Sequence, residues 1–156
     1  MPKRQEPKYR EIEPADVRAT IDVRIRTREN TYTEAQLARA GITEESLIER
    51  LSSSHKGWLC ECDDRVAGFC IADRTNGELW VVAVLPEFER KGIGNELMSR
   101  AEKWLWACGW QRAWLTTDLD TSLRAYRFYR RRGWTDWKVS SSLRWMELAA
   151  PAAAGA

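Results

Sequence analysis

The sequence contains one histidine and four cysteines in 156 residues, and this scarcity limits the metal chemistry that it can support. Cys60 and Cys62 are separated by one residue, which is not a zinc-knuckle spacing, and His55 is the only imidazole. Cys70 and Cys108 stand in segments of apolar pattern, where a buried free cysteine acts as a small hydrophobic residue. We therefore expect no metal ion, and free cysteines fit a reducing compartment.

The sequence also has no long apolar run, few glycines and prolines, and a small net charge. The longest apolar run covers residues 79–85, far below the roughly 18 residues of a membrane-spanning helix. The opening MPKRQEPKYRE is charged and lacks the apolar stretch of a secretory signal, so we expect a cytoplasmic protein. With 9 Gly and 5 Pro the chain is neither collagen-like nor of low complexity. A formal charge of +2 is too small to imply nucleic-acid binding by itself.

What the sequence does contain is a globular composition, with 44% hydrophobic and 31% charged residues. This length is typical of one domain, and we place that domain at residues 1–148. The remaining residues, 149–156, form an alanine-rich segment that we expect to be disordered.

The hydrophobic pattern predicts seven strands and several helices. Pro14 favours a helix over residues 14–28, although part of that segment also alternates like a strand, and Thr33 and Thr43 are typical of helix N-caps. Two longer helices are expected at 93–108 and in the segment that Gly133 closes. The expected strands cover residues 9–13, 58–62, 66–72, 79–85, 113–117, 134–139 and 143–148. This order predicts a mixed α/β sheet with helices on its faces.

One junction carries chemistry: a strand ends at Pro86 and a turn with Gly92 and Gly94 leads into a helix. Unpaired amides at a helix start attract anions, and glycines let a phosphate approach the main chain, so a diphosphate is the expected ligand. Leu97 stands where the dinucleotide fingerprint needs a small residue, and no P-loop pattern is present. The alternative is an ordinary glycine-containing turn between strand and helix.

Two motifs make the sequence resemble the GNAT superfamily of acetyl-CoA-dependent N-acetyltransferases, from about Tyr9 to Leu148. The first is a Val-x-Pro strand end followed by a turn with the two glycines; here residues 84–86 precede 89–94. The second is a helix motif that this sequence matches at Ser122, Ala125, Tyr129, Gly133 and Trp134. The resemblance implies a single-domain, mostly antiparallel seven-stranded sheet with helices on both faces.

The resemblance also implies a site, with acetyl-CoA as co-substrate and no metal. Tyr129 matches the family's general acid, although a core aromatic residue is the alternative, and Glu78 matches a base that some members use, although it also fits a solvated turn. His55 and Asp118 are weaker candidates for the base. A bulge in the strand before the turn is expected to free backbone groups for the cofactor. The implied cofactor-binding residues are Val82, Ala83, Val84, Glu89, Arg90, Lys91, Gly92, Ile93, Gly94, Asn95, Ser122 and Tyr129.

Two positions depart from the family pattern. Glu89 replaces the usual Gln or Arg, and because a carboxylate repels phosphate we expect its side chain to point outward, while backbone amides, Arg90 and Lys91 keep the loop attractive to anions. Ser122 replaces a frequent Asn, which weakens one expected contact near the pantetheine arm.

Arginines and tryptophans are the remaining unusual features. We interpret the arginines at 124, 127 and 130–132 as the solvated face of a helix, with RNA contact as the alternative. Among nine tryptophans, Trp104 and Trp114 are expected in the core, whereas Trp58, Trp80 and Trp145 are candidates for an acceptor pocket.

Our hypothesis is an N-acetyltransferase that acts on a primary amine of a small molecule or peptide by direct attack. The alternatives are acetylation of aminoacyl-tRNA and a non-catalytic CoA-binding or interaction module. No membrane partner is expected, and a homodimer fits the resemblance.

Overall fold

The computed structural model describes residues 6–29 and 32–152. The first residues of the opening segment (1–5) and the end of the predicted tail (153–156) lie outside the described residues, so the predictions for them stay predictions. Among residues 6–29 and 32–152, no helix has the length and apolar character needed to cross a bilayer.

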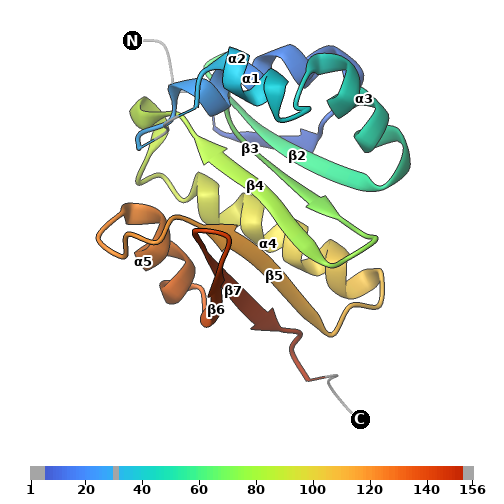
Figure 1. The fold of residues 1–156 in the computed structure, drawn as a ribbon. Coiled ribbons are helices and arrows are strands. Elements are labelled where there is room, and N and C mark those ends of the chain that lie inside the picture. Colours follow the sequence, from blue (N-terminus) through green and yellow to red (C-terminus); the bar gives the residue numbers. More distant parts are fainter. Residues whose placement is uncertain (1–5, 30–31, 153–156) are drawn as a thin grey trace.

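The described residues form one sheet of seven strands in the order β1-β2-β3-β4-β5-β7-β6 (Figure 1). Every neighbouring pair is antiparallel except β4 and β5, which run parallel. This arrangement confirms the predicted fold class. The strands are β1 (Lys8–Glu11), β2 (His55–Cys62), β3 (Arg65–Asp73), β4 (Glu78–Val84), β5 (Arg112–Thr117), β6 (Thr135–Ser140) and β7 (Leu143–Ala149).

Helices cover both faces of the sheet (Figure 1). A 3-10 turn, η1 (Pro14–Asp16), leads into α1 (Val17–Arg26), which confirms helix rather than strand for this segment. The predicted N-caps also hold, because Thr33 accepts a hydrogen bond from the Gln36 amide (3.2 Å) and Thr43 from the Ser46 amide (3.1 Å). These caps begin α2 (Glu34–Arg39) and α3 (Glu44–Ser53), on the same face as α1.

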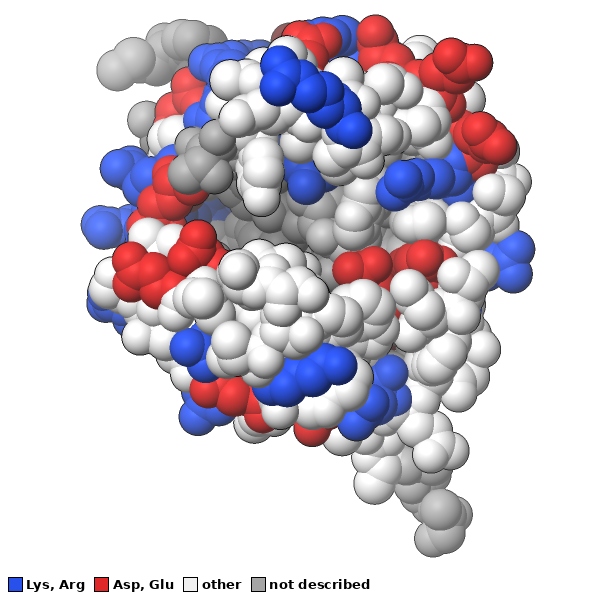
Figure 2. All heavy atoms as spheres, viewed as in Figure 1, with Lys and Arg blue, Asp and Glu red and all other residues white. Residues whose placement is uncertain are grey.

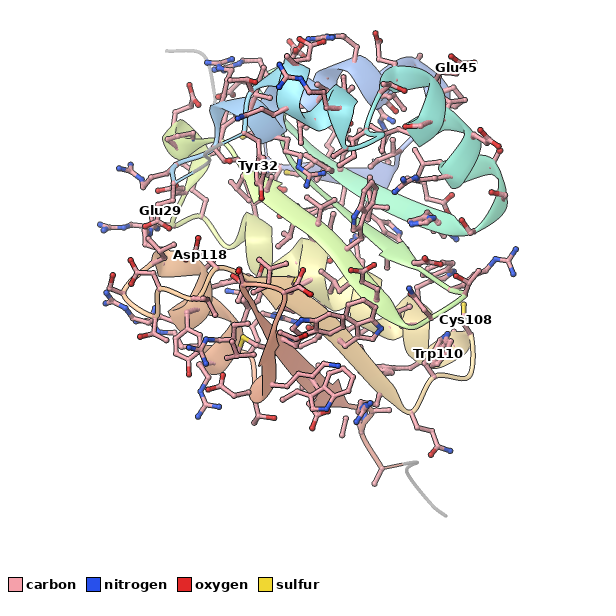
Figure 3. All side chains as sticks on the ribbon, in the orientation of Figure 1. Glu29, Tyr32, Glu45, Cys108, Trp110 and Asp118 are labelled. Carbon is pink, nitrogen blue, oxygen red and sulfur yellow. The ribbon has the colours of Figure 1, made fainter. Side chains whose placement is uncertain are left out.

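The opposite face carries α4 (Ile93–Ala107), which follows a second 3-10 turn, η2 (Pro86–Phe88). Its apolar stripe of Ile93, Leu97, Ala101 and Leu105 is buried, as the helical spacing predicts. Cys108 caps this helix and is exposed (Figure 3), so the expectation that it fills a buried position is wrong: the helix ends there and its side chain lies beyond the core.

A buried polar cluster connects the segment after α5 (Arg124–Arg131) to α4. Just after α5, the Arg132 guanidinium pairs with the Glu102 carboxylate (2.7 Å), and the fully buried Trp134 indole donates to the same carboxylate (3.0 Å). Interpreting Arg132 as a solvated residue is therefore wrong, because a buried carboxylate needs a cationic partner.

Strands β4 and β5 separate almost as soon as they meet. Within the described residues they share one register position, Glu78 opposite Trp114, and β4 carries an irregularity opposite Ile71 and Ala72 of β3. Beyond Glu78 the facing edges of both strands have no strand partner, so backbone groups of Val82–Val84 are left free along the gap. The predicted separation of β4 from its neighbour is thus present. The bulge is at Trp80, two residues before Val82.

Candidate active site

A cavity of about 730 Å³ opens where β4 and β5 diverge. Its walls come from the end of β4, the turn before α4, the first residues of α4, one side of α5 and the segment after α1. The lining residues are Thr27, Arg28, Glu29, Val82, Ala83, Val84, Phe88, Glu89, Arg90, Gly92, Ile93, Gly94, Asn95, Arg124, Ala125, Arg127, Phe128, Tyr129 and Arg131.

The turn before α4 has the geometry of an anion site. Gly92 is the N-cap of α4 with φ +78°, and no side chain caps the helix start. Arg90 also has a positive φ (64°), so the backbone turns twice within three residues. A Cβ atom added to Gly92 meets nothing within 4 Å, which means that the missing side chain leaves open space on the cavity wall. Uncapped amides at the positive end of a helix dipole attract a phosphate.

Glu89 does not point outward as expected. Its side chain is only 18% exposed and lies in the cavity, where the carboxylate forms ion pairs with Arg28 (3.3 Å) and with Arg124. The prediction considered only repulsion between this carboxylate and a phosphate. Two guanidinium groups from distant segments, rather than the adjacent Arg90 and Lys91, provide the countercharge, and they hold the carboxylate inside.

The arginines within α5 are exposed, as predicted, and three of them also border the cavity. Arg124, Arg127 and Arg131 line the cavity at helical spacing i, i+3 and i+7. The start of α5 is capped from afar, because the Glu29 carboxylate accepts a hydrogen bond from the Arg124 amide (3.2 Å), and Figure 3 shows Glu29 beside this end of the helix. The spacing of Arg124, Arg127 and Arg131 was the signal in the sequence that predicts one helix face directed toward a ligand.

Tyr129 lies at the cavity wall and is 9% exposed. Burial, with a smaller contribution from Cys70, raises the pKa of the Tyr129 phenol above its ordinary value. The phenol therefore stays protonated at neutral pH. Among the described residues no hydrogen bond engages its hydroxyl, so the group is available to a ligand in the cavity.

Three of the predicted site residues lie outside the cavity. Lys91 turns away and its ammonium lies over the Phe88 ring (5.3 Å), and the Ser122 hydroxyl donates to Asp120 (2.6 Å). Glu78 lies at the other side of the strand gap. The lining residues that sequence reasoning missed are Thr27, Arg28, Glu29, Phe88, Arg124, Ala125, Arg127, Phe128 and Arg131.

Glu78 begins β4, opposite Trp114 of β5. Figure 2 shows the molecule hollowed between the α1–α3 layer and the β5–β7 strands, with acidic side chains at one end. Burial, followed by the charge of Asp73, raises the pKa of Glu78 to about 7. Asp118 is exposed (Figure 3), and the His55 ring is engaged by Ser54 (2.6 Å) with its pKa lowered by burial. Of the candidate bases, Glu78 alone combines a raised carboxyl pKa with a place at the strand gap.

Tryptophans lie near Glu78, but they are not the predicted set. Trp58 is buried and packs edge-on against Trp104 of α4 (5.8 Å), so it belongs to the core. Trp114 instead stacks on Trp145 (4.8 Å), next to Glu78 in register, and Trp80 lies on the same strand as Glu78. Trp58 was predicted in the acceptor pocket and lies in the core, whereas Trp114 was predicted in the core and lies outside it. Both predictions are wrong because side chains alternate between the two faces of a strand, and the sequence did not show which face α4 covers.

Comparisons with known proteins agree with this geometry. A sequence model of the acetyltransferase (GNAT) family matches residues 20–134. The PaiA N-acetyltransferase of Thermoplasma acidophilum, solved in complex with coenzyme A, has a similar fold (TM-score 0.81, 22% identity, 94% of this chain and 100% of that chain covered). Two others are Ard1 of Thermoplasma volcanium (0.72, 20%, 94% and 99%) and the ribosomal-protein-S18-alanine N-acetyltransferase of Escherichia coli (0.73, 16%, 97% and 99%). No curated protein matches the sequence.

The family match covers most of the chain, and the chain belongs to the GNAT acetyltransferase family. It is an acetyl-CoA-dependent N-acetyltransferase. Within the part of the chain that the structure describes, no group of His, Cys, Asp or Glu side chains is arranged to hold a metal ion.

Proposed function

We propose that the protein transfers the acetyl group of acetyl-CoA to a primary amine of a small molecule or peptide by direct attack of the amine. The observation that supports this most is that one cavity joins an uncapped helix start, the free edge of β4 and a protonated tyrosine. The amine nitrogen bonds to the acetyl carbon, the carbon–sulfur bond breaks, and the products are an N-acetyl amine and free CoA.

The cavity residues fit the cofactor. The backbone of Arg90–Asn95 is suited to the diphosphate, and the edge of Val82–Val84 is suited to the amide groups of the pantetheine arm. Arg127 and Arg131 add positive charge on the facing wall. When bound, acetyl-CoA supplies an acetyl group already activated as a thioester, so the enzyme itself needs no nucleophile.

Glu89 needs its own explanation, because a carboxylate in a phosphate-binding cavity is unfavourable. In our proposal it keeps Arg28 and Arg124 in the cavity, and these guanidiniums turn to the phosphates of the cofactor when it binds. The cofactor then competes with an internal carboxylate, which weakens binding.

Tyr129 is our proposed general acid, donating its hydroxyl hydrogen to the sulfur as the carbon–sulfur bond breaks. A thiol has a pKa of about 8.5 and a phenol one of about 10. Burial raises the phenol's pKa further, so proton transfer to the sulfur is uphill unless the thiolate forms in a site without water. The buried position of Tyr129 suits that requirement.

Glu78 is our proposed base. An amine with a pKa of about 10.4 is almost fully protonated at pH 7, so it must lose a proton before it attacks. A carboxyl group with a pKa of about 7 is half ionised at neutral pH and accepts that proton more readily than an ordinary glutamate does. Since Glu78 lies outside the cavity, the proton passes through water in the gap between β4 and β5.

The acceptor class is consistent with both small molecules and peptides. The name of the Escherichia coli relative gives a ribosomal protein as its acceptor, but at 16% identity that likeness concerns the fold. Acetylation of aminoacyl-tRNA stays the alternative: the arginines within α5 are exposed, although three of them border the cavity and Arg132 pairs with Glu102. A cytoplasmic location and a homodimer stay predictions.

A thiol-release assay tests the proposal. Acetyl-CoA and the protein are incubated with a panel of primary amines, and free thiol is measured together with the mass of the product. We expect thiol release that depends on an amine and a product heavier by one acetyl group. Binding of CoA without thiol release from any amine would favour the non-catalytic module instead.

A further inference from the structure

Two arginines that lie against Trp80 of β4 have no carboxylate partner among residues 6–29 and 32–152. Arg24 of α1 and Arg50 of α3 both lie against the ring of Trp80, with their guanidinium carbons 5.6 and 4.7 Å from its centre. By contrast, Arg18 of the same α1 helix pairs with Asp22 (2.7 Å) and Glu34 (2.5 Å). Arg24 and Arg50 thus differ from the ordinary surface arginines of this layer.

Their environment is unfavourable without an anion. Both residues are half-buried. Burial lowers the pKa of Arg24; the interaction with Tyr32 opposes this shift, and the positive charge of Arg50 adds to it. Two like charges in a partly desolvated place raise the free energy of the site unless a counterion binds. The planar fork of arginine suits a carboxylate or a phosphate.

One of these two charges also acts on Glu78. Glu78 precedes Trp80 by two residues on β4, and the positive charge of Arg50 opposes the rise in the pKa of Glu78 that burial causes. Two further titratable groups near Trp80, His55 and Asp73, are engaged by neighbours. The His55 ring meets Trp80 edge-on (5.3 Å), and the Asp73 carboxylate accepts hydrogen bonds from the Thr75 amide (2.8 Å) and hydroxyl (2.6 Å).

We infer that the acceptor carries an anionic group, a carboxylate or a phosphate, a few bonds from its primary amine. The anion binds Arg24 and Arg50, the amine faces Glu78, and the stacked pair Trp114 and Trp145 provides an apolar wall for the carbons between them. This inference rests on the proposed transfer reaction and narrows its substrate. Basic side chains above the hollow and acidic ones at its end agree with such a dipolar acceptor (Figure 2).

Matched acceptors of similar length test this. γ-Aminobutyrate supplies a carboxylate, O-phosphoethanolamine a phosphate, n-butylamine no second charge and putrescine a second cation. We expect kcat/KM for at least one anionic acceptor to exceed that for n-butylamine by about tenfold or more, since hydrogen bonds to charged groups are the stronger ones. The better of the two anionic acceptors then identifies carboxylate or phosphate as the preferred group.

Variants assign the effect to the arginines. Arg24→Gln and Arg50→Gln should each raise KM for the anionic acceptor about tenfold, with little change in kcat and none in the KM of n-butylamine. Arg39→Gln, on the exposed side of α2, is the matched control and should change nothing. If a glutamine variant does not fold, Arg24→Lys and Arg50→Lys replace it in the kinetic measurement. Because they keep the positive charge, they should retain part of the preference for the anionic acceptor over n-butylamine.

Two results would overturn the inference while leaving acetyl transfer intact. One is equal or better turnover of n-butylamine or putrescine, and the other is an unchanged KM in both glutamine variants. If no acceptor releases thiol, the proposed reaction fails instead, and calorimetry with CoA present decides the anion site separately. Binding of γ-aminobutyrate or O-phosphoethanolamine that both variants weaken supports the site, and absence of binding refutes it.

Discussion

Replacing Gly92 by valine tests the cofactor loop most directly, because the structure separates two effects of the change. The first is strain: Gly92 has φ +78°, and a residue with a side chain in this left-handed conformation costs about 1–2 kcal/mol. For a domain of this size each kcal/mol lowers Tm by about 2–4 °C, so strain alone predicts a loss of about 2–8 °C. The second effect concerns only the ligand: Gly92 lines the cavity and an added Cβ meets no protein atom within 4 Å, so we expect the valine side chain to obstruct the ligand and not the protein.

Gly109 provides a matched control. It has φ +99°, a Cβ atom added to it also meets nothing within 4 Å, and it ends α4 far from the cavity lining. Gly109→Val therefore carries similar strain without touching the ligand. The comparison of the two variants removes the stability effect from the measurement.

Thermal unfolding with and without CoA is the assay. At a CoA concentration of 100 times Kd the folded state gains about 2.7 kcal/mol, which corresponds to a rise in Tm of about 5–11 °C for a domain of this size. We expect wild type and Gly109→Val to show this rise and Gly92→Val to lose it. A rise of wild-type size in Gly92→Val would refute the assignment of the loop to the phosphates.

Three further predictions concern single side chains. Tyr129→Phe should lower kcat by ~10²–10⁴-fold with little change in CoA affinity, whereas Tyr126→Phe, whose hydroxyl contacts Asp136 outside the cavity, should not; steady-state kinetics checks both. Glu89→Gln removes a charge that repels a phosphate by about 1 kcal/mol at 4 Å in water, so calorimetry should show CoA binding about fivefold tighter, and weaker binding would contradict our account of this carboxylate. The kcat/KM profile should rise with pH through about 7 as Glu78 loses its proton, and Glu78→Gln should remove that rise; an unchanged profile would exclude this base.

Much of the fold was predictable because its signals are local. The side chains of Thr33 and Thr43 cap helices through residues three positions away, and the Asn76–Gly77 turn joins two strands with Gly77 at φ +79°. The helix over 17–26 was the ambiguous case, because Ile21, Val23 and Ile25 fit both periods. The buried faces of Val17 and Ile21 against the sheet decide it, and that contact is not local.

The prediction of the site was correct where a local backbone pattern defines it, and it was wrong where charges from distant segments meet. The glycine turn and Tyr129 lie on one cavity, as the two motifs indicate. The orientation of Glu89 depends on Arg28, 61 residues earlier, and on Arg124, 35 residues later, so no window of the sequence contains the ion pairs that turn it inward. The wrong placement of Trp58 and Trp114 has a similar origin, because it depends on which face of the sheet α4 covers.

The sequence by itself determined the order of helices and strands, the glycine turn and the phenol at position 129, since these follow from hydrophobic period and backbone freedom within a few residues. Only the tertiary structure decided which charges neutralise one another: it paired Glu89 with two arginines, buried Glu102 against Arg132, and left Arg24 and Arg50 beside Trp80 without a carboxylate among the described residues. The physical reason is that Coulomb interactions and desolvation depend on distance in space, whereas the pattern of a sequence records distance along the chain.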